Sequence, residues 1–304
     1  MKQFIKSVVL FSLFASLFYV LAILFVGKLS PKILNGNILV ENKISANDFS
    51  EKRYLDLKKS DSIDLAIFGS SHAYRGYDNR IFNNVGMRTL NLGSSSQTPI
   101  LTEFIYNNYI VEISPKIILI DIYPILLTKN SEEGDLNVLP IFYNNLGFIA
   151  EGINGSDIRV INSLIYFQVF GNARNVKSRI SHNDKYVDGG YVSNFGVKED
   201  KKKYKVTALE IKEKNIVALK NIVTDAEKKG IKVFLFQAPL PEERYKSYSN
   251  NKEINSIMHS IGKYYNYNDV GFLPSQYFMD DSHINQKGVD VYNKWVIDKI
   301  KENE

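Results

Sequence analysis

The chain has 304 residues, and none of them is cysteine. This absence excludes disulfide bonds, thiolate zinc sites, a cysteine nucleophile and lipid attachment through cysteine, although it leaves the cellular compartment open. Basic residues do not gather in a block with interleaved aromatic residues, and the formal net charge is only +5, so we expect no nucleic-acid partner. The chain shows neither a glycine-rich phosphate loop nor a metal-ligand spacing of His, Asp and Glu, so no cofactor and no metal are predicted.

Charge is missing from one long stretch near the start, Ser7 to Val26. At a rise of about 1.5 Å per residue, a helix over this stretch spans about 30 Å, the thickness of a bilayer hydrocarbon core. A cleaved signal peptide is the alternative, but its apolar region is usually about 7–15 residues long, and Phe25 to Lys28 make a poor cleavage site. We therefore predict that residues 1–27 form one N-terminal transmembrane helix that stays attached as an anchor.

The charges around this stretch say little about its orientation. Lys2 and Lys6 precede it, and Lys28 and Lys32 follow it, so the positive-inside rule only weakly favours a cytoplasmic N-terminus. A large folded domain after a single N-terminal span is commonly exported, and the heavy use of Lys, Asn, Ile and Tyr is typical of an AT-rich bacterial genome. We expect a bacterial cell-membrane protein with an extracytoplasmic domain at 61–304, joined to the anchor by a polar stalk at 28–60.

Short apolar runs alternate with amphipathic helices after the stalk. Strands are expected at Asp64–Phe68, Arg88–Leu92, Ile117–Ile122 and Ile231–Phe236. Helices are expected at 98–112, from the capping-box pair Thr207 and Glu210 to Gly230, at 254–261 and at 286–301. This alternation predicts an α/β fold with a mainly parallel sheet covered on both faces. Residues 126–205 look irregular apart from one helix around 158–180, and are predicted to be an insertion that serves as a lid or substrate-binding region.

Two serines follow the first predicted strand, in the segment Gly69 to His72. Ligand sites of parallel sheets lie at the carboxyl ends of the strands, and a glycine there lets the chain turn sharply and expose the next side chains. Serines in such a turn are more commonly plain turn and capping residues. The position makes this segment a candidate nucleophile site only if a base lies nearby.

The candidate base is His283, which precedes the last predicted helix and follows Asp280 by three residues. A serine nucleophile needs an imidazole within hydrogen-bond reach, and the imidazole needs a carboxylate that fixes its tautomer. The plain alternative is an acidic loop with a surface histidine. Together the two segments predict a triad of a serine from the first segment with His283 and Asp280, and Asp281 is the second choice for the carboxylate.

In this order and context, the two segments resemble those of the SGNH (GDSL-type) hydrolase superfamily. The resemblance implies a flavodoxin-like three-layer α/β/α fold and chemistry on ester bonds. Gly69 to Ser71 corresponds to the family's Gly-Asp-Ser start, and this resemblance implies that Ser71 is the nucleophile of a triad with His283 and Asp280. Ser70 stands at the aspartate of that start, a departure seen in relatives with a Gly-Ser-Ser start that act on cell-surface polymers. Ile284, Asn285 and Gly288 extend the match at the other end.

The middle of the chain matches the family less well. Asn91 to Thr98 resembles its second block, but Ser96 stands where the family has the glycine whose backbone N–H serves the oxyanion hole. The third block, Gly-x-Asn-Asp, is absent, and Asp121 to Pro124 stands in its place. Loss of one oxyanion donor can cost about 100- to 1000-fold in rate. The remaining candidate donors are the N–H groups of Ser71 and Ser96 and the Tyr123 hydroxyl.

Three further side chains near these blocks are candidates for contact with a substrate. His72 and Tyr123 are the first two, with a structural or rim role as the alternative for His72. Arg75 is the third, because it could bind an anionic substrate, and a salt bridge within the fold is the alternative reading.

These observations favour a serine esterase or O-acyltransferase that acts on an acylated glycan, with acetyl as the expected group, or on another small ester. The membrane is the expected partner of the anchor, and proteins of envelope-polymer biosynthesis are candidate partners. A catalytically inactive binding or assembly module is the main alternative, motivated by the absent third block. A lipase acting on the membrane itself is the third hypothesis.

Overall fold

The computed structural model describes residues 1–30, 34, 38, 49–59, 62–154, 157–171, 183–197 and 203–303. Within these residues, parallel strands form a central sheet in the order β2-β1-β3-β6-β7. Its strands are β1 (Leu65–Phe68), β2 (Thr89–Asn91), β3 (Ile117–Asp121), β6 (Lys232–Gln237) and β7 (Lys263–Asn266). This order is that of a flavodoxin-like sheet, so the predicted α/β fold is confirmed.

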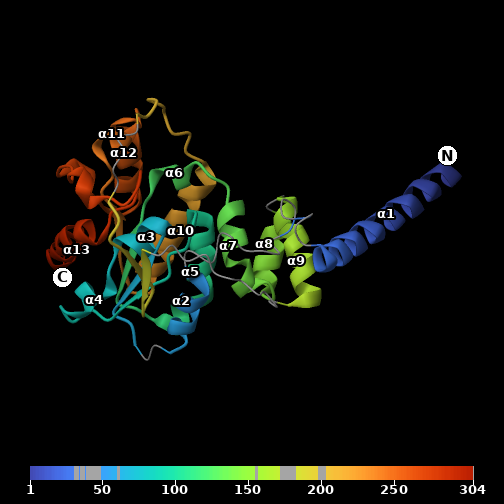
Figure 1. The fold of residues 1–304 in the computed structure, drawn as a ribbon, viewed down its shortest axis with the longest axis horizontal. Helices are drawn as coiled ribbons and strands as arrows, with labels where there is room; N and C mark the ends of the chain where they lie inside the picture. Colours follow the sequence, from blue (N-terminus) through green and yellow to red (C-terminus); the bar gives the residue numbers. More distant parts are fainter. Residues whose placement is uncertain are drawn as a thin grey trace.

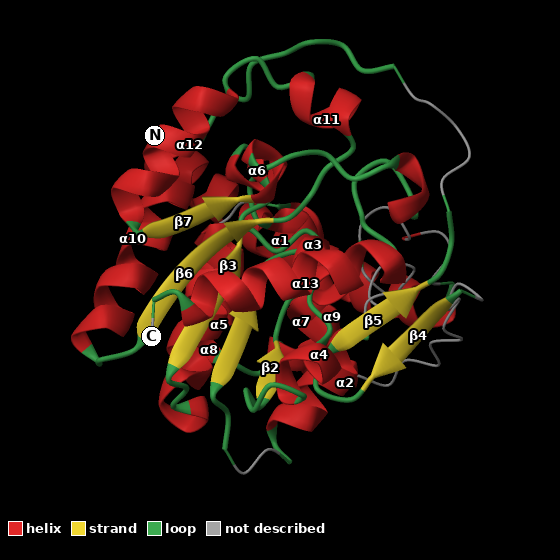
Figure 2. Ribbon diagram, turned by 90° about the vertical axis from the view of Figure 1, so that its left-hand side faces the viewer, coloured by secondary structure: helices red, strands yellow, loops and turns green. Residues whose placement is uncertain are grey.

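Helices cover both faces of the sheet, which gives the predicted three layers (Figure 2). One layer contains α5 (Pro99–Ile113), α10 (Glu213–Lys228) and α12 (Asn251–Ile261), and the other contains α3 (Ser71–Gly76), α4 (Asn79–Asn83) and α13 (Gln286–Lys301). Alternate residues of β1 divide between the layers, because successive side chains of a strand point to opposite faces. Ala66 and Phe68 pack with α5 and α10, whereas Leu65 and Ile67 pack with α3 and α13.

The N-terminal helix α1 (Lys2–Leu29) extends away from the sheet (Figure 1). By length and composition it is long and apolar enough to cross a membrane. Its C-terminal half contacts α9 (Ile158–Phe170), where the Tyr19 hydroxyl donates a hydrogen bond of 2.8 Å to Asn162 Oδ1. Helix α1 is therefore joined to the predicted insertion by side-chain contacts as well as through the chain.

The stalk prediction at 28–60 is wrong at its C-terminal end. Residues Ser50–Leu57 form α2, whose Tyr54 and Leu57 belong to the main hydrophobic cluster. Arg53 is buried beside them and donates from Nε to the carbonyl of Gly190, 2.8 Å away. Tyr54 and Leu57 lie three residues apart on one face of this short helix, and that face packs on the domain. Most of residues 31–48 lies outside the described residues.

The segment predicted to be irregular, 126–205, is mostly helical where it is described. Its elements are α6 (Pro124–Leu127), α7 (Glu132–Phe142), α8 (Leu146–Asn154), α9 and the antiparallel hairpin of β4 (Asp184–Val187) and β5 (Tyr191–Asn194). Helices α7, α8 and α9 lie between the sheet and α1 (Figure 1). The helix predicted to reach residue 180 ends at Phe170, and Gly171 follows with a φ of 62°; residues 172–182 lie outside the described part.

In the C-terminal half, the start of one predicted helix needs correction and one strand was not predicted. The helix predicted to open at Thr207 starts at Glu213 instead. Thr207 forms backbone hydrogen bonds with Ser247 and Ser249, at 2.9 and 3.0 Å, and these hold it outside the helix. Strand β7 was not predicted, because its four residues do not form an apolar run; as an edge strand it pairs with β6 alone and is only partly buried.

Candidate active site

The turn after β1 presents Ser71 at the carboxyl edge of the sheet. Gly69 has a φ of 138°, and a Cβ there would lie 2.9 Å from the carbonyl of Asp121, so this sharp turn requires glycine. Ser70 caps α3 and accepts a hydrogen bond from the N–H of His72 at 3.2 Å. Ser71 is consequently the first residue of α3, with its backbone N–H at the free end of the helix.

The structure brings Ser71 and His283 together although 212 positions separate them in the chain. Ser71 Oγ lies 2.7 Å from His283 Nε2. On the other side of the ring, Nδ1 lies 2.8 Å from Oδ2 and 3.0 Å from Oδ1 of Asp280. A carboxylate can only accept, so Asp280 selects the tautomer with hydrogen on Nδ1 and leaves Nε2 free to accept the serine proton.

Asp280 is held in its charged form by groups from its own loop. The N–H groups of Ser282 and His283 each donate to Oδ1 at 2.8 Å. Burial by itself would raise the pKa of Asp280, but the hydrogen bond from His283, its charge and these two N–H groups outweigh burial and bring the pKa well below the ordinary value. The carboxylate is therefore charged at neutral pH, as its role beside an imidazole requires.

The residues that follow His283 fix the loop against α13. Asn285 caps the helix by accepting from the N–H groups of Lys287 and Gly288, and its side-chain amide donates to the carbonyls of Gly196 and Gln276 at 2.9 and 2.8 Å. A Cβ on Gly288 would lie 2.6 Å from the carbonyl of Tyr277. The resemblance noted at Asn285 and Gly288 thus corresponds to capping and close packing.

The loop between β2 and α5 packs directly against the Ser71 turn. The N–H of Ser94 donates to the carbonyl of Gly69 at 3.1 Å, and a Cβ on Gly93 would lie 2.7 Å from that of Ala73. Ser96 has a φ of 54°, in the left-handed region that glycine adopts most easily. The replacement of the family's glycine by Ser96 has therefore kept a glycine-like backbone conformation. That the backbone N–H of Ser96 donates to an oxyanion stays a prediction.

His72 is packed inside the site and does not face solvent. It is only 4% exposed, and its ring stacks on Tyr123 with centroids 3.9 Å apart and lies 4.7 Å from the ring of His283. Burial, followed by the charges of His283 and Arg244, lowers the pKa of His72 well below its ordinary value, against the opposing charge of Asp280. The predicted substrate contact of His72 is not supported, and the structural alternative fits its burial.

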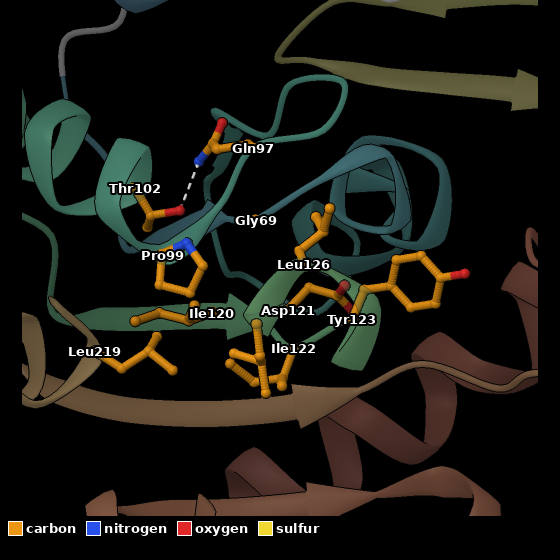
Figure 3. Close-up of a pocket in the computed structure, with 11 residues that line it drawn as sticks. Gly69, Gln97, Pro99, Thr102, Ile120, Asp121, Ile122, Tyr123, Leu126 and Leu219 are labelled. Atoms are coloured by element: carbon orange, nitrogen blue, oxygen red, sulfur yellow. Dashed lines mark hydrogen bonds between the residues drawn. The ribbon is translucent and has the colours of Figure 1, made fainter. Parts of the chain in front are cut away.

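Tyr123 and Arg75 also differ from the first expectation. The Tyr123 ring turns away from the neighbouring cavity (Figure 3), and Arg244 Nη2 lies 3.5 Å from its hydroxyl. Arg75 forms a two-pronged ion pair with Asp184 of β4, at 2.8 and 2.9 Å, and both side chains are buried. Arg75 therefore joins α3 to the hairpin, as the salt-bridge alternative predicted.

Asp121 forms a buried network beneath the site that sequence reasoning missed. The Tyr77 hydroxyl lies 2.9 Å from Asp121 Oδ2 and 2.8 Å from the hydroxyl of Tyr292. Burial raises the pKa of Asp121 to about 7, although the hydrogen bond from Tyr77 opposes the shift. A lone carboxylate at the end of an otherwise apolar strand was the signal that could have revealed this network.

A small cavity lies between the N-terminal end of α5, the end of β3 and α6 (Figure 3). Its volume is about 10 Å³, which is room for roughly one water molecule or a group of similar size. Gly69, Gln97, Asp121, Tyr123 and Leu219 are among its lining residues. Gly69 and Tyr123 belong to segments that also form the site, so the cavity borders the nucleophile turn.

No protein-family model matches the chain, and no curated protein matches it either. Among solved structures it is similar to a GDSL-like lipase from Bacteroides thetaiotaomicron, with 12% identity and a TM-score of 0.45 over 85% of this chain and 99% of that one. A lipase/acylhydrolase from Enterococcus faecalis has 12% identity and a TM-score of 0.41 over 79% and 95% of the two chains. The psychrotrophic esterase EstA from Pseudoalteromonas has 11% identity and a TM-score of 0.39 over 79% and 97%.

Proposed function

We propose that this chain is a membrane-anchored serine esterase or O-acyltransferase of the SGNH (GDSL-type) superfamily. The observation that carries the proposal is the continuous hydrogen-bonded chain from Ser71 through His283 to Asp280. This series of hydrogen bonds starts at Ser71, which is the first residue of a helix at the carboxyl edge of a parallel sheet. Nucleophile, base and orienting carboxylate then have the distances that acyl transfer requires.

The reaction follows from these contacts. Ser71 Oγ attacks the ester carbonyl while its proton passes to His283 Nε2, and the charged Asp280 stabilises the imidazolium. The N–H groups of Ser71 and Ser96 hold the oxyanion. His283 then returns the proton to the departing alcohol, which leaves the acyl group on Ser71. Water releases it in an esterase, and a sugar hydroxyl accepts it in an O-acyltransferase.

The proposed substrate is a short acyl ester, with acetyl first, on a cell-envelope glycan or exopolysaccharide outside the membrane. The apolar α1 supports the anchored location. Proteins of envelope-polymer biosynthesis are the proposed partners. We expect p-nitrophenyl acetate to be cleaved faster than the butyrate and octanoate esters.

The test is labelling of the full-length chain in detergent with a fluorophosphonate, beside the variants Ser71→Ala and Ser282→Ala. Ser282 is a matched control because its hydroxyl also lies near the imidazole, 3.3 Å from Nδ1, but on the side away from Ser71. Labelling of the parent and of Ser282→Ala, but not of Ser71→Ala, supports the enzyme. No labelling of the parent and no cleavage of p-nitrophenyl acetate would exclude it.

A non-catalytic assembly module is the second candidate, and one observation favours it. The asparagine donor of the third block is missing, and the Tyr123 hydroxyl that could replace it lies beside Arg244. The oxyanion would then depend on backbone donors alone. An unlabelled Ser71 in a correctly folded chain would be the result that this second candidate predicts.

A further inference from the structure

Arg244 differs in its partners from most of the other arginines among the described residues. Four of them form ion pairs with carboxylates: Arg75 with Asp184, Arg80 with Asp78, Arg88 with Asp64 and Arg159 with Asp157. Arg244 has no such ion pair within the described residues, and the neighbouring Glu242 pairs with Lys246. Burial acts to lower the pKa of Arg244, but Tyr123 and Tyr248 raise it above the ordinary value. Among the described residues, no acid forms an ion pair that neutralises this positive charge.

The guanidinium of Arg244 is held in a fixed place by aromatic side chains. It lies 4.8 Å from the ring centroid of Tyr204 and 5.4 Å from that of Tyr248, which are cation–π distances. Nη2 approaches the Tyr123 hydroxyl at 3.5 Å, and Nε is buried without a hydrogen-bond partner among the described residues. A guanidinium offers five N–H donors, and burial without acceptors costs free energy. This geometry leaves donors that an oxyanion could satisfy.

Arg244 also lies at the same edge of the sheet as the triad. It belongs to α11 (Glu242–Lys246), which follows the carboxyl end of β6, and β6 pairs with β3 up to Asp121. Helices α6 and α11 lie beyond the tips of these strands (Figure 2). The Tyr123 ring that contacts Arg244 stacks on His72, which in turn lies against His283. The rings of Tyr123 and His72 therefore connect Arg244 to the imidazole of His283.

We propose that Arg244, with the Tyr123 hydroxyl, is a subsite for a carboxylate or phosphate group that the substrate carries near its ester. Planar oxyanions match the guanidinium fork and form charge-assisted hydrogen bonds with it. The proposal rests on the proposed function and narrows its substrate to an anionic glycan, such as one built from uronic acids or phosphorylated units. The Arg244 side chain then selects the substrate, while the triad performs the chemistry.

The experiment compares esters that differ only in charge, with the full-length chain in detergent. The substrates are 4-acetoxybenzoate, its neutral methyl ester and 4-acetoxyphenyl phosphate, each rate being divided by the rate of uncatalysed hydrolysis. We expect kcat/KM to favour at least one anionic ester by about 10-fold or more, as one charge-assisted hydrogen bond provides. The ester that is favoured shows whether carboxylate or phosphate is the better ligand. The preference should shrink at high salt.

Variants of α11 test whether the preference for an anionic ester depends on Arg244. Arg244→Gln should bring the ratio of anionic to neutral ester close to one, and Arg244→Lys should keep part of it. Lys246→Gln is the matched control, because this exposed lysine on the same short helix is paired with Glu242; it should keep the ratio of the parent. Thermal melting shows whether each variant is folded.

The outcomes separate the subsite from the proposed function. A ratio near one in the parent, or a ratio that Arg244→Gln leaves unchanged, overturns the subsite while the esterase stands. If no ester is cleaved at all, the proposed function fails, and calorimetric titration of 4-acetoxybenzoate and of 4-acetoxyphenyl phosphate into the Ser71→Ala chain decides the subsite. Binding that disappears in Ser71→Ala/Arg244→Gln supports it, and the same affinity in both chains overturns it.

Discussion

Replacing His72 by phenylalanine removes a buried titratable group while keeping an aromatic ring against Tyr123. The folded chain keeps His72 neutral, because the ring is only 4% exposed, Nε2 has no hydrogen-bond partner among the described residues, and burial lowers its pKa. In the unfolded chain the pKa of a histidine is about 6.5. The two states therefore bind different numbers of protons below that pH.

The sign and size of the effect follow from this difference. Above pH 6.5 His72 is neutral in both states and contributes no pH dependence. Below it the unfolded chain takes up a proton that folded His72 refuses, so the free energy of unfolding falls by about 1.4 kcal/mol per pH unit until the folded pKa is reached. Between pH 8 and 5 the parent should therefore lose stability because of His72, and His72→Phe should not.

Asp121 changes the free energy of unfolding with pH in the direction opposite to His72, so the two effects must be measured separately. Its folded pKa of about 7 lies above its ordinary value, so it stabilises the fold at low pH, and this stabilisation is lost as the pH rises towards 7. The profile of the parent is consequently flattened between pH 4 and 6.5. The difference between variant and parent is the informative quantity, and Asp121→Asn should steepen the acid loss of stability.

Urea unfolding at pH 8, 6.5 and 5 measures these differences, with the fluorescence of Trp295, the one tryptophan of the chain, as the signal. His259→Phe is the matched control, because His259 is exposed on α12; its profile should follow that of the parent. If the gap in unfolding free energy between His72→Phe and the parent is the same at pH 8 and pH 5, His72 is not held neutral and the reasoning is refuted.

Three further substitutions test the surroundings of the triad. Asp280→Asn should lower kcat roughly 10,000-fold, because an amide no longer enforces the imidazole tautomer; steady-state kinetics with a loss below tenfold would contradict this role. Arg75→Ala should destabilise the fold by about 3–5 kcal/mol in urea unfolding, because it leaves a buried carboxylate unpaired, and the double variant with Asp184→Ala should recover part of that loss. Gly134→Ala places a Cβ 2.7 Å from the carbonyl of Ser96, the second predicted oxyanion donor, so kcat/KM should fall. Gly271→Ala has no atom within 4 Å of its Cβ and should change kcat/KM little.

Elements with strong local signals were predicted well from the sequence. The last helix was expected at 286–301 and is found at Gln286–Lys301, because its Asn285 cap and its apolar stripe are both local properties. The strands at β1, β3 and β6 agree to within a residue or two, since each is a short apolar run buried on both faces. Where a distant segment competed for the backbone, as at Thr207, the local signal failed.

In the candidate site, too, local signals predicted some features and contacts between distant segments decided the others. Ser71, His283 and Asp280 could be named from two short segments because each segment carries its own turn, cap and spacing. The burial of His72, the pairing of Arg75 with Asp184 and the approach of Arg244 to Tyr123 could not be predicted, since each depends on side chains that are distant in the sequence.

The sequence by itself determined the parallel α/β architecture, the apolar N-terminal helix and the choice of Ser71, His283 and Asp280 as candidates for a triad, because these follow from hydrophobic period, uninterrupted apolar length and motifs a few residues long. Only the tertiary structure decided which charges are neutralised and which remain available. Arg75 and Arg244 look alike in the sequence, yet one is buried against an aspartate, and the other lies against the Tyr123 hydroxyl with no ion pair among the described residues. The physical reason is that the state of a charge depends on the dielectric and the partners around it in space, and folding alone assembles those surroundings.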